Sequence, residues 1–128
     1  MHRESRLPVG APLVAIIDDD EDVRMSLETL LASHGYRTML FSDADSFLAS
    51  EVRGDANCII TDVQMPGKSG IELARIVREG AGQPVILITA FPANGIDAQA
   101  RAAGVRALYR KPFDPDALIE EVRLAVDI

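Results

Sequence analysis

The amino-acid sequence predicts an α/β fold, a three-layer doubly wound sandwich in which helices cover both faces of a five-stranded parallel sheet. Five short apolar runs rich in β-branched residues alternate with segments whose apolar residues recur at helical spacing. This alternation implies right-handed crossovers, and therefore parallel strands. The 128 residues, 48% of them hydrophobic and 26% charged, are enough for one packed domain and leave no room for a second.

The first strand is predicted at "LVAII" (13–17), because a continuous apolar run is typical of a strand buried on both faces. A helix follows, which Gly35 should end. Helical spacing is shown by Val23, Leu27, Leu30, Leu31 and His34, and Met25 falls on the opposite face. The second strand is "YRTMLF" (36–41). Ser42 is predicted to cap a short second helix that contains Phe47, Leu48 and Val52.

The third strand is "CIITD" (58–62). A third helix is indicated by Ile71, Leu73, Ile76 and Val77, and it should end near Gly80 and Gly82. Pro84 then precedes the fourth strand, "VILIT" (85–89). The third strand has the most buried-looking pattern of the five.

The last third of the chain has a weaker helical signal. "IDAQARAAG" (96–104) is expected to form a short, mobile fourth helix, and "RALYRK" (106–111) the fifth strand. Asp114 is placed to cap the fifth helix, with Pro115 at its first position. Leu124 should face outward, opposite a buried stripe of Leu118, Ile119, Val122, Ala125 and Val126.

Charge and composition exclude several classes of protein. A net charge of −7 repels nucleic acid and anionic lipid, so direct nucleic-acid binding by this domain is not expected. No apolar run approaches the ~18 residues of a membrane span, and the amino terminus lacks the apolar core of a secretory signal. Residues 1–11 are expected to be a flexible tail before a domain at 12–128, in a cytoplasmic protein whose one cysteine, Cys58, is buried.

Chemically active residues follow four of the predicted strands. Asp18 and Asp19 end the first strand, Asp62 the third, Thr89 the fourth and Lys111 the fifth. Because ligands of open parallel sheets bind outside the carboxyl ends of the strands, these side chains should meet at one edge. Carboxylates held close together raise one another's pKa unless a cation compensates, and Mg²⁺ prefers such oxygen ligands.

Asp62 is the best candidate for a nucleophile, because a carboxylate can attack phosphorus and form an aspartyl phosphate. It is fixed by a buried strand and followed by a Pro-Gly turn. Lys111 and the Thr89 hydroxyl would neutralise the oxygens of a transferring phosphoryl group. Taken singly, each of these residues has an ordinary structural explanation, such as a turn, a helix cap or a solvated charge. Only their joint placement points to chemistry.

These residues resemble the receiver domains of two-component response regulators, from about Leu13 to Val126. The resemblance is carried by "IIDDDEDVR", "IITDVQMPGKSGIEL", "VILITA" and "RKPF". It implies a flavodoxin-like fold with strand order 2-1-3-4-5. It also implies that Asp62 is the phosphoacceptor and that Asp18 and Asp19 are the acidic pair, with Asp19 favoured as the direct metal ligand.

The resemblance assigns the remaining roles as well. Lys111 corresponds to the lysine that contacts the acyl phosphate, in a cis peptide bond with Pro112, and Thr89 to the switch hydroxyl. The backbone carbonyl of Gln64 corresponds to the third protein ligand of Mg²⁺, for which Mn²⁺ could substitute. The domain would catalyse only its own phosphorylation and dephosphorylation and would not be an enzyme toward other substrates.

Two positions depart from the pattern. The usual aromatic switch position, three residues before the lysine, is Leu108, and Tyr109 is its neighbour. Phe91, two residues beyond Thr89, is expected to lie over the phosphoryl site and slow self-dephosphorylation.

The implied partners are a sensor histidine kinase or a phosphotransfer protein. Met25 is a candidate for docking the donor. Leu124 belongs to a face of the fourth helix, fifth strand and fifth helix that could form a homodimer or bind an effector.

Three alternatives compete with this interpretation. A non-phosphorylated receiver-like interaction module would need none of the acids, lysine or threonine. A flavodoxin-like cofactor carrier needs a phosphate cradle after the first strand, where this chain has five acidic residues. A metal-dependent phosphohydrolase would turn over free phosphate esters repeatedly, but no cap or substrate pocket is evident in the sequence.

Overall fold

Five strands form one parallel sheet in the computed structural model, which describes residues 10–127. They lie in the order β2-β1-β3-β4-β5, and every neighbouring pair is parallel. Their bounds are Leu13–Ile17 for β1, Arg37–Phe41 for β2, Cys58–Asp62 for β3, Val85–Thr89 for β4 and Ala107–Arg110 for β5. The predicted sheet and its strand order are confirmed.

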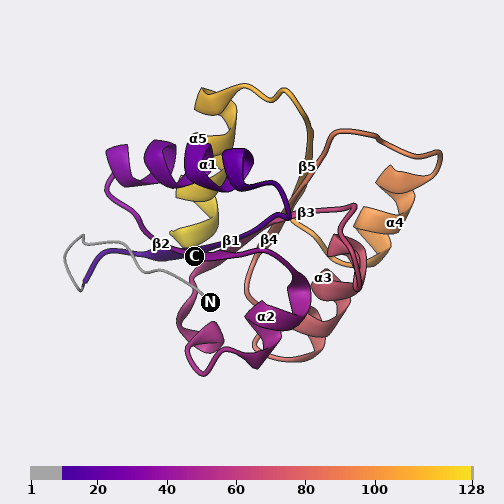
Figure 1. The fold of residues 1–128 in the computed structure, drawn as a ribbon, viewed down its shortest axis with the longest axis horizontal. Helices are drawn as coiled ribbons and strands as arrows, with labels where there is room; N and C mark the ends of the chain where they lie inside the picture. The colour runs from indigo at the N-terminus through magenta and orange to yellow at the C-terminus, as the bar shows by residue number, and fades with distance from the viewer. Residues whose placement is uncertain (1–9, 128) are drawn as a thin grey trace.

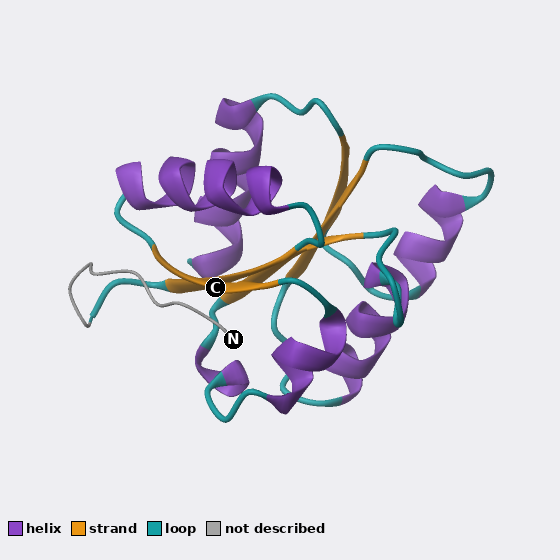
Figure 2. Ribbon diagram, in the orientation of Figure 1, coloured by secondary structure: helices purple, strands orange, loops and turns teal. Residues whose placement is uncertain are grey.

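Helices cover both faces of the sheet, as Figure 1 shows: α1 and α5 lie on one face, and α2, α3 and α4 on the other. Figure 2 shows the loops that join them to the strands. The helices are α1 (Glu21–Ser33), α2 (Ala44–Ala49), α3 (Gly70–Glu79), α4 (Ile96–Ala102) and α5 (Pro115–Val126), with a short 3-10 helix at Arg53–Asp55. The predicted three-layer sandwich is therefore present.

Alternate residues of each strand pack into two separate cores. In β1, Leu13, Ala15 and Ile17 face α2, α3 and α4, whereas Val14 and Ile16 face α1 and α5. All five side chains are buried, because a central parallel strand has helices on both sides. The core beneath α5 contains Leu118, Val122 and Ala125, while the predicted Ile119 and Val126 are partly buried at its margin.

Helix ends mostly follow the predicted capping residues. Asp114 caps α5 by accepting a hydrogen bond from the Asp116 amide. Gly35, which follows α1, has a φ of 87°, a left-handed conformation that favours glycine. Ser42 does not cap α2: the cap is Asp43, whose carboxylate accepts from the Ser46 amide at 2.7 Å. Both residue types cap helices well, so the sequence could not decide between them.

The end of the second helix also differs from the prediction. The second helix ends at Ala49, and Val52 lies beyond it, partly buried against the core. The expected tail, residues 1–11, falls largely outside the described residues. Ala11 itself is held, because its carbonyl accepts a hydrogen bond from Arg37 Nε at 2.9 Å.

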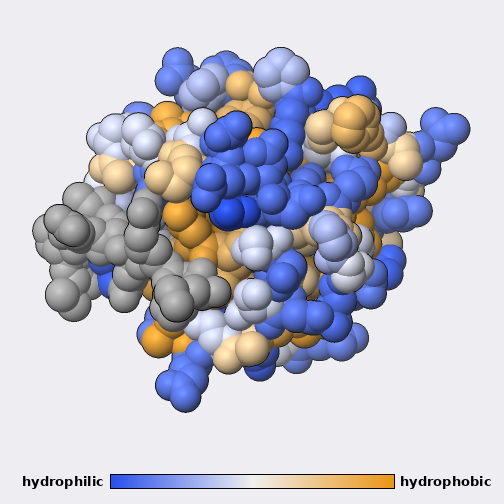
Figure 3. Space-filling view, in the orientation of Figure 1, coloured by the Kyte–Doolittle hydropathy of each residue, from blue (hydrophilic) through white to orange (hydrophobic). Residues whose placement is uncertain are grey.

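Hydrophilic side chains gather over the amino-terminal half of α1 in the view of Figure 3. None of the helices within residues 10–127 is both long and apolar enough to cross a membrane. Cys58 is fully buried in β3, as predicted, and burial raises the pKa of its thiol to about 12.

Candidate functional site

Three carboxylates meet at the carboxyl edge of the sheet. Asp18 follows β1 directly and is fully buried, Asp62 is the last residue of β3 and is 6% exposed, and Asp19 is exposed. One oxygen from each lies within 4.8 Å of the others. The pairing of β1 with β3 produces this meeting, because it brings Ile17 beside Thr61 and thus the two strand ends together. The predicted acidic cluster is confirmed.

Lys111 brings a positive charge to this cluster from the end of β5. Its Nζ lies 2.9 Å from Asp18 Oδ2 and 3.7 Å from Asp62 Oδ2. The peptide bond between Lys111 and Pro112 is cis, as expected from the resemblance. The other Asp18 oxygen, Oδ1, accepts from the Asp20 amide at 2.9 Å. Lys111 therefore pairs more closely with Asp18 than with Asp62.

Asp62 is left with unsatisfied bonding capacity. Its Oδ1 is buried and has no hydrogen-bond partner within the described part of the chain. Burial raises the pKa of the Asp62 carboxyl to about 6, the neighbouring Asp18 carboxylate also raises it, and the Lys111 ammonium lowers it. A buried carboxylate with an unpaired oxygen and a like-charged neighbour is poised to accept a cation or an electrophile.

Thr89 lies at the same edge, but its hydroxyl is hydrogen-bonded to Gln64 and not to the acidic cluster. Thr89 is fully buried, and its Oγ1 donates a hydrogen bond to Gln64 Oε1 at 2.8 Å. Gln64 Nε2 donates in turn to the backbone carbonyl of Phe91 at 2.9 Å. The sequence singled out Gln64 only for its backbone carbonyl, which stays a prediction. Its side-chain role was missed.

Gly70 is a second residue that sequence reasoning missed. It begins α3, and a Cβ built on it would lie 2.2 Å from the carbonyl oxygen of Asp62. The Gly70 amide also donates to the Val63 carbonyl at 3.0 Å. The helix start is thus packed directly on the backbone that carries Asp62. The signal was a glycine in the first turn of a helix, which is costly unless a close approach requires it.

The donor set fits a hard divalent cation. The ligands that Asp18, Asp19 and Asp62 can offer are all carboxylate oxygens, and Asp62 Oδ1 is buried without a hydrogen-bond partner among residues 10–127. If all three carboxylates are ionised, Lys111 balances only one of the negative charges. Hard cations prefer oxygen ligands and would relieve this excess. The cluster could therefore hold a metal ion.

Leu108, at the position where an aromatic switch residue is usual, and its neighbour Tyr109 lie on opposite faces of β5. Leu108 packs against the core beneath α2, α3 and α4, whereas Tyr109 packs against the core beneath α1 and α5. The Tyr109 hydroxyl donates to Glu121 Oε1 at 3.3 Å. Because neighbouring strand residues face opposite sides of a sheet, Tyr109 does not occupy the place of the missing aromatic residue.

The two predicted partner residues are exposed: Met25 on α1 is 41% exposed and Leu124 on α5 is 43% exposed. Phe91, which was expected to lie over the phosphoryl site, is 78% exposed on the β4–α4 segment, and its effect on dephosphorylation stays a prediction. A groove of about 420 Å³ lies between α1 and the segment after β5; Val23, Leu27, Leu30, Lys111 and Phe113 are among the residues that line it. Since Lys111 reaches Asp62, this groove adjoins the acidic cluster.

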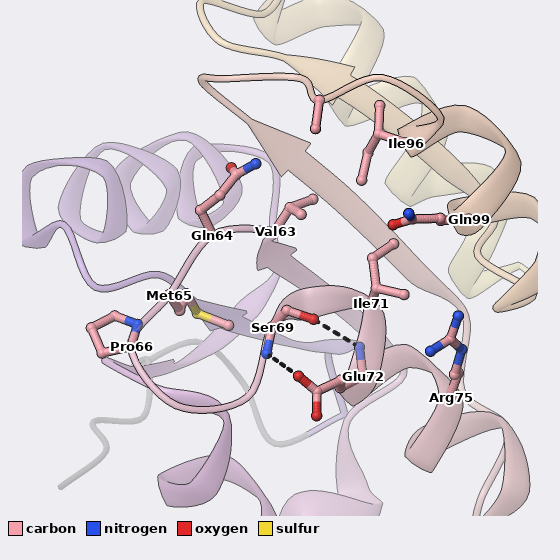
Figure 4. A pocket seen from close by; sticks show the side chains of 11 residues that line it. Val63, Gln64, Met65, Pro66, Ser69, Ile71, Glu72, Arg75, Ile96 and Gln99 are labelled. Carbon is pink, nitrogen blue, oxygen red and sulfur yellow. Dashed lines mark hydrogen bonds between the residues drawn. The ribbon is translucent and has the colours of Figure 1, made fainter.

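A second groove, of about 750 Å³, lies between α3 and α4 (Figure 4). Gln64, Met65 and Pro66 from the loop after β3 form one wall, and Ile96 and Gln99 from α4 form another. At its floor, Ser69 and Glu72 form a reciprocal capping box at the start of α3. Gln64, which contacts Thr89 and Phe91, thus lies in the wall that faces α4.

Comparisons with known proteins agree with this geometry. A family model described as the response regulator receiver domain matches residues 14–123. The transcriptional regulatory protein FixJ of Azorhizobium caulinodans is 39% identical over 121 residues, which are 94% of this chain and 57% of that protein. The C4-dicarboxylate transport transcriptional regulatory protein DctD of Pseudomonas aeruginosa is 34% identical over 116 residues, 90% of this chain and 25% of that protein.

Solved structures share the fold. The receiver domain of BeF3-activated DrrB superposes with a TM-score of 0.83 at 25% identity, covering 92% of this chain and 99% of that one. A CheY-like receiver domain from Methanospirillum hungatei superposes with a TM-score of 0.85 at 24% identity, covering 92% and 95%. The chain spans little more than half the length of the FixJ protein and a quarter of DctD.

Proposed function

Because the chain belongs to the response regulator receiver family, we propose that it is a phosphorylation-gated signalling switch in which Asp62 accepts a phosphoryl group from a sensor histidine kinase or a phosphotransfer protein. The observation that carries this proposal is the buried Oδ1 of Asp62, which has no hydrogen-bond partner in the described part of the chain and lies beside Lys111 and two further carboxylates. The proposed setting is the cytoplasm, where such phosphodonors act.

The proposed transfer forms one bond and breaks one. A carboxylate oxygen of Asp62 attacks the phosphorus of a phosphohistidine, and the O–P bond forms as the N–P bond breaks. The imidazole nitrogen leaves with the electron pair and takes up a proton from solvent. Hydrolysis later returns inorganic phosphate and the free carboxylate. In this proposal the domain catalyses only these changes to itself and acts on no other substrate.

Asp18, Asp19 and Asp62 would hold a Mg²⁺ ion, together with the backbone carbonyl of Gln64, and Mn²⁺ would substitute. When bound, the ion supplies positive charge that offsets the carboxylates and the phosphoryl oxygens. Lys111 adds a fixed ammonium on the other side of Asp62, 3.7 Å from Oδ2. A phosphoryl group carries about two negative charges, so it would draw Lys111 away from Asp18 and favour a donated hydrogen bond from Thr89.

The test is intact-mass analysis after incubation with acetyl phosphate, with and without Mg²⁺. We expect one phosphoryl group per chain, only with the metal, and none in Asp62→Asn. Asp19→Asn serves as a metal-site variant that keeps the acceptor and should respond only at higher Mg²⁺. Absence of uptake by the native chain would favour the alternative, a receiver-like module that binds partners without phosphorylation.

The groove beside Lys111 is proposed to receive a helix of the phosphodonor protein. Its apolar lining continues to the ammonium next to Asp62, so an occupant would bring its phosphohistidine to the acceptor. Met25 does not line the groove, but it is exposed on α1, the helix that contributes Val23, Leu27 and Leu30 to the lining. Met25→Glu should slow transfer from the cognate protein donor while acetyl phosphate reacts as before. Leu124→Glu, a matched exposed position on α5, is the control.

The output surface is proposed to be the face of α4, β5 and α5, on which Leu124 is exposed. This surface would form a homodimer or bind an effector when the β4–α4 segment changes conformation.

A separate proposal concerns the effect of Phe91 on the lifetime of the phosphorylated state. Phe91→Ala should shorten that lifetime if the ring hinders attacking water, and an unchanged lifetime would exclude that role. The ring is 78% exposed, so the substitution should leave folding intact.

A further inference from the structure

The side chain of Gln64 bridges two loops that the sequence separates. Gln64 lies two residues beyond Asp62, and its amide reaches Thr89 Oγ1 at 2.8 Å and the Phe91 carbonyl at 2.9 Å. These partners lie 25 and 27 residues further along the chain. Figure 4 shows the amide turned away from Met65 and Pro66, on the other side of the loop. One side chain thus ties the β3–α3 loop to the β4–α4 segment.

The chemistry of the partners fixes the orientation of this amide. A backbone carbonyl can only accept hydrogen bonds, so Nε2 must face Phe91. Oε1 then faces Thr89 and can only accept, which makes the Thr89 hydroxyl the donor. A hydroxyl has one proton to donate, and here Thr89 donates it to Gln64 Oε1. Thr89 is therefore unable to donate to Asp62, whose buried Oδ1 has no partner among the described residues.

We propose that Gln64 is a positioning residue that stabilises the unphosphorylated state by holding the Thr89 hydroxyl and the Phe91 backbone. This inference rests on the proposed function, because it concerns the hydroxyl that a phosphoryl group on Asp62 would need. On phosphorylation, Thr89 exchanges the neutral Gln64 oxygen for a charged phosphoryl oxygen, which is the stronger acceptor. Gln64 is exposed, so water can satisfy its released oxygen at little cost.

The bridge also explains how a change at Thr89 would reach the surface. When Thr89 is released, Gln64 keeps only its bond to Phe91, on a segment whose residues 90–95 are all exposed. That segment leads into α4, where Ile96 and Gln99 line the groove opposite Gln64. Loss of the bridge would therefore loosen the segment and alter the groove between α3 and α4.

The first test measures the unphosphorylated protein by NMR, without Mg²⁺ or a phosphodonor. In Gln64→Met, which keeps the length of the side chain but none of its polar atoms, we expect lower backbone order parameters for residues 91–95. Gln64→Ala should act in the same direction. Gln83→Met is the matched control, because Gln83 donates to the carbonyls of Arg53 and Ala56, remote from this segment. Unchanged order parameters in both Gln64 variants would overturn the proposal.

The second test measures the rate of phosphorylation by acetyl phosphate with Mg²⁺. Freeing the hydroxyl from one neutral hydrogen bond should raise the rate constant about two- to tenfold in Gln64→Met. The same substitution in a Thr89→Val background should have almost no effect, because the hydroxyl is already absent. An equal gain in both backgrounds, or no gain in the native background, would overturn the proposal.

The two tests separate this inference from the function on which it rests. If the native chain takes up no phosphoryl group at all, the proposed function fails. The order parameters still decide whether Gln64 anchors the segment, since that measurement needs no phosphorylation.

Discussion

The middle of the sheet and its carboxyl edge are equally buried but chemically opposite. Ile16 and Ile60 are 0% exposed in the middle of β1 and β3, and two residues further on Asp18 and Asp62 are 0% and 6% exposed. In the middle, burial removes apolar surface from water and stabilises the fold. At the edge, the same burial opposes the ionisation of two carboxylates that share one lysine.

The difference shows that the middle of the sheet stabilises an edge that is costly to form. Asp62 keeps a raised pKa, and an oxygen with no hydrogen-bond partner among the described residues, because its strand is fixed by apolar packing two residues earlier. Buried unpaired polar groups of this kind are concentrated at functional sites. Substitutions in the middle should therefore destabilise the protein, whereas some at the edge should stabilise it while removing function.

The largest effect is expected for Ile60→Ala in the middle of β3. The change leaves a cavity in a fully packed strand, and we expect the free energy of unfolding to fall by about 2–5 kcal/mol. Urea denaturation monitored by circular dichroism provides the measurement. Ile76→Ala, at a residue 38% exposed on α3, is the control and should cost clearly less. Equal losses would contradict the assignment of the middle as the stabilising region.

Gly70→Ala should have the next largest effect, because the added side chain would press on the backbone of Asp62 at the carboxyl edge of the sheet. The added Cβ would lie 2.2 Å from the Asp62 carbonyl oxygen, so α3 or the end of β3 must move. We expect a loss of about 1–3 kcal/mol and slower phosphorylation of Asp62. Gly54→Ala is the matched control, since nothing lies within 4 Å of its Cβ. Native phosphorylation and stability in Gly70→Ala would contradict the close approach.

Asp62→Asn should stabilise the protein in EDTA at pH 7 by about 1–3 kcal/mol, because it removes a buried carboxylate that is unfavourable when ionised. The pH dependence follows from the sign of the shift. The carboxyl has a pKa of about 6 in the folded protein, against 3.8 for an unperturbed aspartate, so the folded state binds its proton more tightly.

The stability that this proton provides is complete below about pH 3.8 and is lost as the pH rises through about 6. The advantage of Asp62→Asn over the native chain should therefore grow between pH 4 and pH 7. Denaturation midpoints across that range provide the measurement, with Glu51→Gln, at an exposed carboxylate outside the acidic cluster, as the control. A constant difference across the range would contradict the raised pKa.

The smallest effect is expected for a pair of buried threonines. Thr38 in β2 is fully buried and its hydroxyl has no partner among the described residues, so Thr38→Val should stabilise by up to about 1 kcal/mol. Thr61 in β3 is equally buried, but its hydroxyl donates to the Asp62 carbonyl at 3.0 Å. Thr61→Val should destabilise by about 0.5–1.5 kcal/mol. Thermal denaturation that gave the same sign for both would contradict the comparison.

The sequence predicted those features that depend on repeated patterns. The five strands follow from apolar runs, and the acids meet because parallel strands end at one edge. Helix α5 was well specified, since Asp114 and Pro115 are favourable at its first positions. Helix α4 was predicted to be short, and its seven residues confirm this. Its mobility stays a prediction.

Single contacts within loops could not be predicted. Ser42 and Asp43 are both good capping residues, and the choice of Asp43 depends on how the chain leaves β2. The bonds from Gln64 to Thr89 and Phe91 depend on the shapes of two loops and leave no periodic signal. The preference of Lys111 for Asp18 over Asp62 depends on differences of less than an ångström, 2.9 Å against 3.7 Å.

The buried position of Cys58 has a practical consequence for following the β4–α4 segment. The sequence contains no other cysteine, and burial with a pKa of about 12 leaves almost no thiolate at neutral pH. A cysteine introduced on the exposed segment, for example in place of Ala93, would react selectively with maleimide dyes. The native background thus already permits site-specific fluorescence or spin labelling.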